Sequence, residues 1–160
     1  YVMFAFRRII KPVVWWHWST TALITLIHDV VVVLGALAIL SQLLQLQIQI
    51  PVVVALLTVI GYSINDTVVV FDRIRENIER KISSDFTDTV NQSLQQTITR
   101  SVNTSVTTLA VVLALLFFGG ATLQDFAATL AIGIIVGTYS SLFVAPALLV
   151  WWGRKDGLPH

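Results

Sequence analysis

The sequence predicts an all-α polytopic membrane protein. It should have four complete transmembrane helices, the end of a fifth, and an amphipathic cytoplasmic helical hairpin. Two observations lead to this fold class. The 160 residues are 56% hydrophobic and only 12% charged, whereas soluble domains carry about 25% charged residues. The apolar residues also gather into four stretches, each long enough to cross a hydrocarbon core of about 30 Å.

Composition also narrows the classes of function. The net charge is only +1, so nothing suggests nucleic-acid binding, and the absence of Cys excludes disulfides and thiolate metal sites. The sequence has no Gly-rich phosphate loop of the GxxxxGK type, so energy from ATP would have to come from another chain. No nucleophile–base pair or metal constellation stands out. An enzyme is therefore the least favoured class, and no cofactor is expected.

The chain begins with a short apolar segment. Residues 1–12 are expected to form the end of a transmembrane helix and a cytoplasmic turn, because the apolar run ends at Arg7 and Arg8 and Pro12 interrupts a helix. A free hydrophobic tail is the alternative. Residues 13–41 are expected to form the first complete transmembrane helix, which opens with tryptophans, as interfacial anchors do.

This first complete helix carries a polar stripe at helical spacing. The stripe comprises Thr21, Thr25, His28 and Asp29. It should face other helices and not lipid, and its last two residues lie near mid-span. His28 and Asp29 are either part of a proton path or a buried polar pair that holds two helices together. The second alternative is open because such residues commonly form hydrogen bonds between helices.

Residues 50–72 are predicted to form the next transmembrane helix, with Asp66 inside it before the apolar residues end at Phe71. A carboxylate in lipid costs roughly 3 kcal/mol, so such a residue suggests a function. Asp66 is either a protonatable switch or a carboxylate permanently salt-bridged to a neighbour. Tyr62 shares its helix face, and Asn65, on the neighbouring row, can hydrogen-bond across a helix contact.

Residues 73–99 are predicted to be cytoplasmic amphipathic helices lying along the membrane surface. Apolar residues recur at every fourth position. This spacing drifts by about 40° per step on a helix of 3.6 residues per turn, so one straight helix would not keep them on one face. A break is expected at 83–85, with Asp85 as a new N-cap and Asp88 in the following first turn. The regular apolar spacing disfavours a soluble connecting loop.

Residues 100–119 and 124–152 are expected to form the last two transmembrane helices. In the first of them, Arg100, Thr104 and Thr108 share a face that must line a helix contact or a wet cavity. From its position alone, Arg100 could equally be an arginine whose side chain extends to the membrane interface.

The last helix has features of an interior helix. Gly133 and Gly137 form a pair of small residues that permits close helix packing, and Pro146 predicts a kink. All ten Lys and Arg fall in residues 7–11, 73–81, 100 and 154–155, and successive membrane crossings place these on one side. The positive-inside rule makes that side cytoplasmic, including the tail at 153–160.

One long segment carries a family resemblance. Residues Gly61 to Asn77 read GYSINDTVVVFDRIREN, which closely resembles the signature of the SecF family. These are protein-export membrane proteins of the SecDF complex and relatives of the RND transporters. Other matching pieces are His28-Asp29 with Gly35, Arg100 with the run from Thr104 to Leu109, and Gly119-Gly120.

The resemblance covers nearly the whole chain and implies a fragment. Members of the SecF family have six membrane spans and a large extracytoplasmic domain between the first and the second. This sequence is therefore expected to lack the first span and that domain.

The resemblance also implies a function, a location and partners. It implies an RND-like helical bundle in the bacterial plasma (inner) membrane that uses the proton motive force to assist the Sec machinery in protein export. The implied partners are SecD, the SecYEG translocon, the translocating polypeptide, protons and the lipid bilayer. In such a protein, Asp66 and Arg100 would act together in proton translocation. A supporting polar path or packing role would fall to His28, Asp29, Tyr62, Asn65, Thr104 and Thr108.

Two other classes of function remain open. One is a proton-coupled RND-type exporter of small molecules or lipids. The other is a passive translocon assembly subunit, in which the buried polar residues only fix helix packing.

Overall fold

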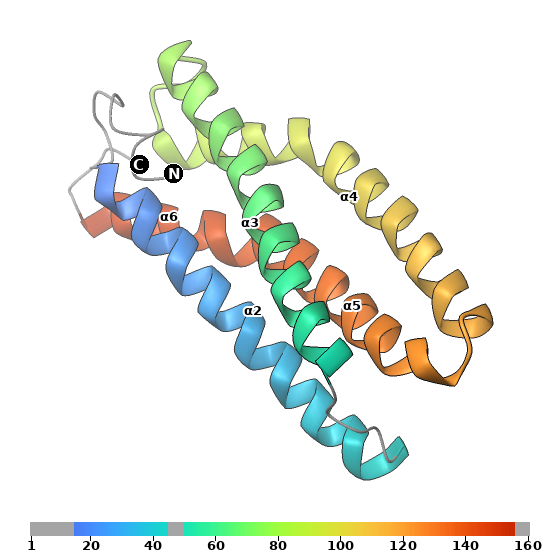
Figure 1. Cartoon of the computed structure of the whole chain (residues 1–160). Helices are drawn as coiled ribbons and strands as arrows, with labels where there is room; N and C mark the ends of the chain where they lie inside the picture. The colour runs from blue at the N-terminus through green and yellow to red at the C-terminus, as the bar shows by residue number, and fades with distance from the viewer. Residues whose placement is uncertain (1–14, 45–49, 156–160) are drawn as a thin grey trace.

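The structure, a computed structural model, describes residues 15–44 and 50–155 (Figure 1). Its elements, in chain order, are α2 (Trp15–Leu44), α3 (Ile50–Glu79), α4 (Phe86–Phe118), α5 (Ala121–Tyr139), the π-helical turn η1 (Ser140–Val144) and α6 (Ala145–Lys155). Within the described residues, four segments are long and apolar enough to cross a membrane, the last being the continuous run α5–η1–α6. The predicted fold class of an all-α polytopic membrane protein with four complete spans is thus confirmed. The helix end expected at 1–12 and the tail beyond residue 155 lie outside the described residues.

The four spans run up and down beside one another. Figure 1 shows the start of α2, the end of α3, the start of α4 and the end of α6 at one end of the bundle, here called the charged end. The run α5–η1–α6 packs against α2, α3 and α4. The last span in the sequence thus contacts all three others, as α3 also does, and it is the most deeply buried of the four.

Two hydrophobic clusters lie at different levels of the bundle. The cluster nearer the charged end comprises Trp18, Val70, Phe71, Ile74, Phe86, Val90, Leu142, Ala145 and Leu149. The cluster nearer the other end comprises Val33, Leu37, Val52, Ala55, Val59, Val112, Ala127, Leu130, Ala131 and Ile134. Along every span, the segment between the two clusters carries buried polar side chains. This buried polar layer comprises Thr21, Thr25, Asp29, Ser63, Asp66, Thr67, Ser93, Thr97, Ser101, Ser105, Ser140 and Ser141.

The polar segment 73–99 differs from the expectation of separate surface helices. Helix α3 continues without a break through Arg73 to Glu79, and α4 already begins at Phe86. Ion pairs three or four residues apart, such as Arg75–Glu79 at 3.0 Å, favour continuation of a helix. The expected start of α4 is present, because Asp85 is its N-cap and accepts a hydrogen bond from the Thr87 amide at 3.0 Å.

The first part of α4 nevertheless changes direction. Figure 1 shows its yellow-green beginning running at an angle to the remainder of the helix. Serine and threonine hydroxyls along it donate back to carbonyl groups four residues earlier. Ser93 bonds Thr89 in this way at 2.6 Å, and Thr97 bonds Ser93 at 2.7 Å. Such bonds often bend helices, so the curvature follows from the hydroxyl-rich sequence without a break.

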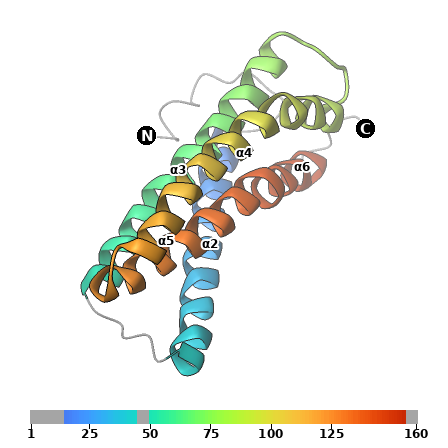
Figure 2. The same cartoon turned by 90° about the vertical axis from the view of Figure 1, so that its right-hand side faces the viewer.

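The last span also bends. Figure 2 shows α6 leaving the direction of α5. The expected kink at Pro146 is thus present, and it begins with the π-helical turn at Ser140–Val144, just before the proline. Because a π-helical turn holds one more residue than an α-helical turn, η1 changes which side chains face the neighbouring helices.

The predicted close packing at Gly133 and Gly137 is confirmed. A Cβ atom added to Gly137 would stand 3.3 Å from the Ser63 Cβ atom, and Gly133 lies against Val59 of the same helix, α3. The two glycines therefore bring α5 close enough to α3 for short side chains to meet between them.

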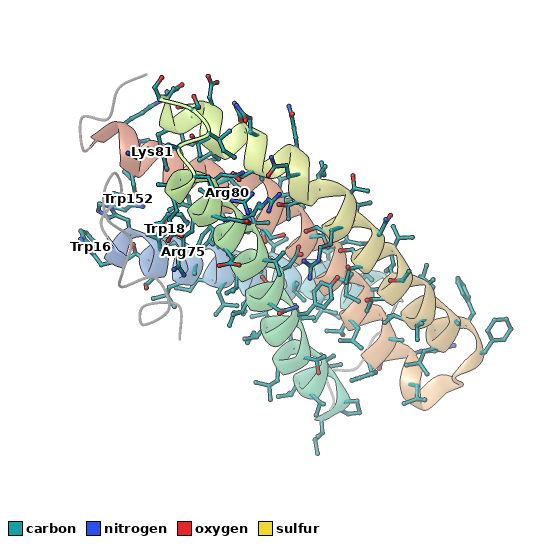
Figure 3. All side chains as sticks on the ribbon, turned by 90° about the horizontal axis from the view of Figure 1, so that it is seen from above. Trp16, Trp18, Arg75, Arg80, Lys81 and Trp152 are labelled. Carbon is teal, nitrogen blue, oxygen red and sulfur yellow. The ribbon has the colours of Figure 1, made fainter. Side chains whose placement is uncertain are left out.

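Aromatic and basic side chains gather at the charged end. Figure 3 shows Trp16, Trp18 and Trp152 on the same side of the bundle as Arg75, Arg80 and Lys81. The Trp152 ring stacks on His17, with ring centroids 4.8 Å apart, and so joins the end of α6 to the start of α2.

Candidate functional site

Asp29 is the best-connected carboxylate of the buried polar layer. Only 1% of the residue is exposed. Its Oδ2 atom accepts hydrogen bonds from the Ser63 hydroxyl of α3 and, at 2.7 Å, from the Ser140 hydroxyl of η1. The His28 Nδ1 atom lies 3.1 Å from Asp29 Oδ1. The bonds from Ser63 and Ser140 to one carboxylate oxygen thus join α2, α3 and η1.

Asp66 lies in the same layer but has fewer partners. Its Oδ2 atom accepts a hydrogen bond from the Ser141 hydroxyl of η1, and 9% of the residue is exposed. Within the described part of the chain, its Oδ1 atom has no hydrogen-bond partner. An ionised carboxylate offers about four acceptor sites. Asp66 therefore keeps an oxygen to which water or a proton donor can bind.

Two consecutive serines hold the two carboxylates. Ser140 bonds Asp29 of α2, and Ser141 bonds Asp66 of α3. Neighbouring residues on a helix point in different directions, so a helix lying beside two others can place consecutive side chains against each of them. The turn η1 occupies such a position, because it packs against both α2 and α3.

A chain of hydroxyl groups crosses the bundle beside the carboxylates. The Tyr62 hydroxyl of α3 lies 3.0 Å from the Ser105 hydroxyl of α4, which lies 2.6 Å from the Thr138 hydroxyl of α5. The three groups link three helices through polar contacts. Hydroxyl groups both donate and accept hydrogen bonds, so the chain can also relay a proton.

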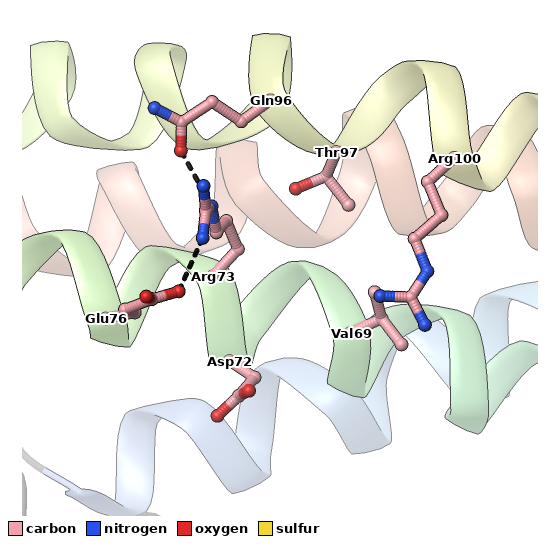
Figure 4. A pocket seen from close by; sticks show the side chains of 7 residues that line it. All are labelled: Val69, Asp72, Arg73, Glu76, Gln96, Thr97 and Arg100. Atoms are coloured by element: carbon pink, nitrogen blue, oxygen red, sulfur yellow. Dashed lines mark hydrogen bonds and ion pairs between the residues drawn. The ribbon is translucent and has the colours of Figure 1, made fainter.

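A cavity of about 330 Å³ opens between α3 and α4 on the charged-end side of Asp66. Its lining residues are Val69, Asp72, Arg73, Glu76, Gln96, Thr97 and Arg100 (Figure 4). Arg73 is held by Glu76 at 2.6 Å and by Gln96 at 2.7 Å. Arg100, by contrast, is exposed and makes no ion pair within the described segments.

The structure brings some of the predicted site residues together but does not join Asp66 to Arg100. Between these two residues, which lie on different helices, no ion pair or hydrogen bond forms. Thr104 and Thr108 form local bonds, donating to the carbonyl groups of Arg100 and Thr104 at 2.9 and 2.8 Å. Asn65 is exposed on the surface of α3.

The sequence reasoning missed the serines that hold the carboxylates. The sequence pattern assigns no site role to Ser63, Ser140 or Ser141. A signal was available, because Ser63 lies one turn before Asp66 on α3 and paired serines in an apolar span suggest a buried contact. The partner of each serine depends on how helices pack, which spacing along one chain does not determine. No group of three His, Asp or Glu side chains able to hold a metal ion is found among the described residues.

The fold and the buried polar layer define a multi-pass helical membrane protein with ionisable side chains inside its bundle. The family model described as "Protein export membrane protein SecD/SecF, C-terminal" matches residues 1–155. The chain belongs to this SecD/SecF family.

Individual relatives agree with this assignment. The chain is 51% identical to the protein translocase subunit SecF of Thermobaculum terrenum, over 99% of this chain and 49% of that protein. It is 47% identical to the protein translocase subunit SecDF of Thermus thermophilus, over 88% of this chain and 18% of that protein. The chain thus spans about half the length of the SecF relative.

A solved structure is similar over the same region. The crystal structure of SecDF in its super-membrane-facing form superimposes with a TM-score of 0.83, at 44% sequence identity, over 96% of this chain and 19% of that one. At this level of identity, the likeness covers both the sequence and the arrangement of the helices.

Proposed function

We propose that this chain is the membrane-embedded part of a SecF-type subunit that couples proton passage to polypeptide translocation by the Sec machinery. The observation that carries the proposal is the placement of Asp66. Its carboxylate is nearly buried, accepts a hydrogen bond from Ser141 alone among the described residues and lies near a cavity open at the charged end.

The cavity supports a route for protons. Val69, one of its lining residues, is one helical turn from Asp66 on α3, a rise of about 4.5 Å. Water that fills the cavity can come within a turn of the carboxylate from the charged end. On the other side of Asp66, the Tyr62–Ser105–Thr138 chain offers hydroxyl groups that can continue the path.

Arg100 supplies a mobile positive charge in this scheme. It lines the cavity and lacks an ion-pair partner in the described part of the chain. Its long side chain is therefore free to approach Asp66 when the carboxylate is ionised and to withdraw when it is protonated. Protonation removes a buried charge and can shift the balance between two helix packings. One charge crossing 100 mV supplies about 2.3 kcal/mol, enough to change such a balance strongly.

Exposed polar side chains on α3 and α4 suggest that another membrane helix packs against them. Asn65 of α3 and Asn103, Thr104 and Thr107 of α4 are exposed within spans that are otherwise apolar. Polar groups facing lipid are costly, whereas they can hydrogen-bond to another helix. We assign this surface to the membrane helices of SecD, and the assembled pair to the SecYEG translocon and its polypeptide.

The proposed location is the bacterial plasma (inner) membrane. Arg75, Arg80 and Lys81 lie at the charged end, and the positive-inside rule assigns this end to the cytoplasm. The opposite connections would then face the outside, where the proton concentration is higher in an energised cell.

The test is protein translocation into vesicles that contain the full-length subunit with SecD and SecYEG, measured with and without a proton gradient. Asp66→Asn preserves the shape of the side chain but cannot carry a proton. It should abolish the stimulation by the gradient while expression and complex assembly stay normal. Asp88→Asn, an exposed acid near the start of α4, is the control and should respond like wild type. A normal response of Asp66→Asn would refute the proposal and favour a passive assembly subunit.

A further inference from the structure

We propose that η1 couples the two buried carboxylates, so that a change of protonation at Asp66 is transmitted to the Asp29 contact that joins α2 and α3. This inference rests on the proposed function and deepens it, because it names the element that would convert a proton on Asp66 into a movement of helices. Ser140 and Ser141 are its positioning residues.

The coupling follows from what each serine holds. Ser141 donates to Asp66, and Ser140, the preceding residue, donates to the same Asp29 oxygen that accepts from Ser63. A rotation of η1 as a whole about its axis turns both serines together. A displacement of η1 that breaks the bond to Asp66 therefore also disturbs the bond to Asp29.

Each serine hydroxyl also has a second acceptor within reach. Ser141 Oγ lies 3.1 Å from the Thr138 carbonyl oxygen, and Ser140 Oγ lies 3.1 Å from the Gly137 carbonyl oxygen. A hydroxyl has one proton to donate. Bonds to an ionised acceptor are roughly twice as strong as bonds between neutral groups. Neutralising Asp66 therefore weakens the hold on Ser141 and shifts its hydroxyl toward its own helix.

The π-helical turn makes the shift possible. A π-helical turn contains one residue more than the α-helical ladder needs, and such turns are frequent at functional sites. The π-helical turn can shift along the span by one residue at a time. Only the residues that it passes then rotate about the helix axis, by about 100°, which is the rotation per residue of an α-helix. Helices α5 and α6 can then keep their own packing while Ser140 and Ser141 change partners.

The ionisable side chains around η1 are consistent with a coupling between Asp29 and Asp66. The two carboxylates contact its serines directly, and His28 reaches Asp29 at 3.1 Å. Tyr62 bonds Ser105 of α4, and Ser105 in turn bonds Thr138, two residues before η1. Tyr139 precedes η1 but is 55% exposed and stacks on Phe143, with ring centroids 5.5 Å apart.

The experiment reads the state of η1 without relying on translocation. Phe143 lies within η1 and is 57% exposed, and this chain has no Cys. A trifluoromethyl label is attached to Phe143→Cys in the full-length subunit, assembled with SecD in vesicles and freed of any other cysteines. Fluorine NMR then gives the ratio of label environments in variants at Asp66, Asp29, Ser140 and Ser141.

Coupling predicts a specific pattern. Asp66→Asn should change the ratio of environments by roughly tenfold, which corresponds to about 1.4 kcal/mol. Ser141→Ala should remove this response, and Ser141→Thr, which keeps the hydroxyl, should retain it. Asp29→Asn should also shift the ratio, and its effect should not add to that of Asp66→Asn, because residues in one hydrogen-bonded network interact.

The contrary results are equally definite. An unchanged ratio in Asp66→Asn, an undiminished response in Ser141→Ala, or simple addition of the two Asp→Asn effects would overturn the coupling. Thr129→Val is the control, because this buried threonine of α5 bonds only a carbonyl of its own helix, at 2.7 Å. It should leave the ratio unchanged. If Asp66→Asn loses gradient-stimulated translocation but leaves the NMR ratio unchanged, the coupling is refuted and the proposed function stands. If Asp66→Asn changes the NMR ratio but translocates normally, the proposed function is refuted.

Discussion

Gly133 of α5 lies so close to Val59 of α3 that a Cβ atom built on the glycine would overlap the Val59 Cγ2 atom. The contact lies in the hydrophobic cluster away from the charged end, where Val59 is 2% exposed. Neither helix can accept a larger side chain here without moving.

Gly133→Ala should therefore destabilise the bundle, because overpacking typically costs about 1–3 kcal/mol. The expected result is a lower thermal unfolding midpoint of the purified protein in detergent. Gly35→Ala is the matched control, because Gly35 is exposed and no atom lies within 4 Å of its added Cβ. Adding Val59→Ala to Gly133→Ala should recover part of the loss. Equal midpoints for the two glycine variants would contradict the close contact.

Asn77→Ala should loosen the hairpin formed by the end of α3 and the start of α4. Asn77 is 1% exposed and donates to Ser93 Oγ at 2.8 Å and Gln96 Oε1 at 3.0 Å. Losing buried hydrogen bonds costs about 1–3 kcal/mol, and local opening should expose the connection around Lys81 to trypsin. The rate of cleavage there should rise roughly fivefold or more. Asn91→Ala, at an exposed position on α4, should leave the rate unchanged.

Arg100→Cys should react with a membrane-impermeant thiol reagent applied from the charged end. Arg100 is exposed and lines the cavity between α3 and α4. If this end is cytoplasmic, labelling should occur in inverted vesicles and not in intact cells. Gln124→Cys, near the start of α5 at the opposite end, should show the reverse pattern. Labelling of both positions from the same side would refute the proposed orientation.

Thr107→Trp should weaken assembly with SecD. The residue is exposed on the polar surface of α4, and a tryptophan would separate two helices that meet there. The expected result is at least a severalfold loss of SecD co-purified from mild detergent. Val31→Trp, which changes an apolar residue of α2 that is 60% exposed, should have no effect. A normal yield of SecD with Thr107→Trp would place the partner on another face.

The number and order of the spans could be predicted because hydropathy over about 20 residues determines which segments cross a membrane. The N-cap at Asp85 and the close approach at Gly133 were also predictable, since each depends on a local pattern. The continuation of the membrane helices α3 and α4 into this polar segment, on either side of the break before Phe86, was not predictable. The spacing of apolar residues does not include the salt bridges and side-chain bonds that keep each helix continuous.

The candidate site was predictable only in part. Asp29 and Asp66 stand out because a charge inside an apolar span is unusual. Their partners Ser63, Ser140 and Ser141 do not stand out, since serine is common in interior helices. Which serine meets which acid depends on the π-helical turn and on how α5 packs between its neighbours.

The contacts of the run α5–η1–α6 with all three other spans have a consequence for synthesis. This span is the last of the four to leave the ribosome, yet it supplies the Ser141 hydroxyl bonded to Asp66 and one of the two hydroxyls bonded to Asp29. Until it enters the membrane, α2, α3 and α4 hold two incompletely bonded acids. The three earlier helices therefore cannot settle into their final packing during translation, and completion of the last helix sets the moment at which the bundle closes.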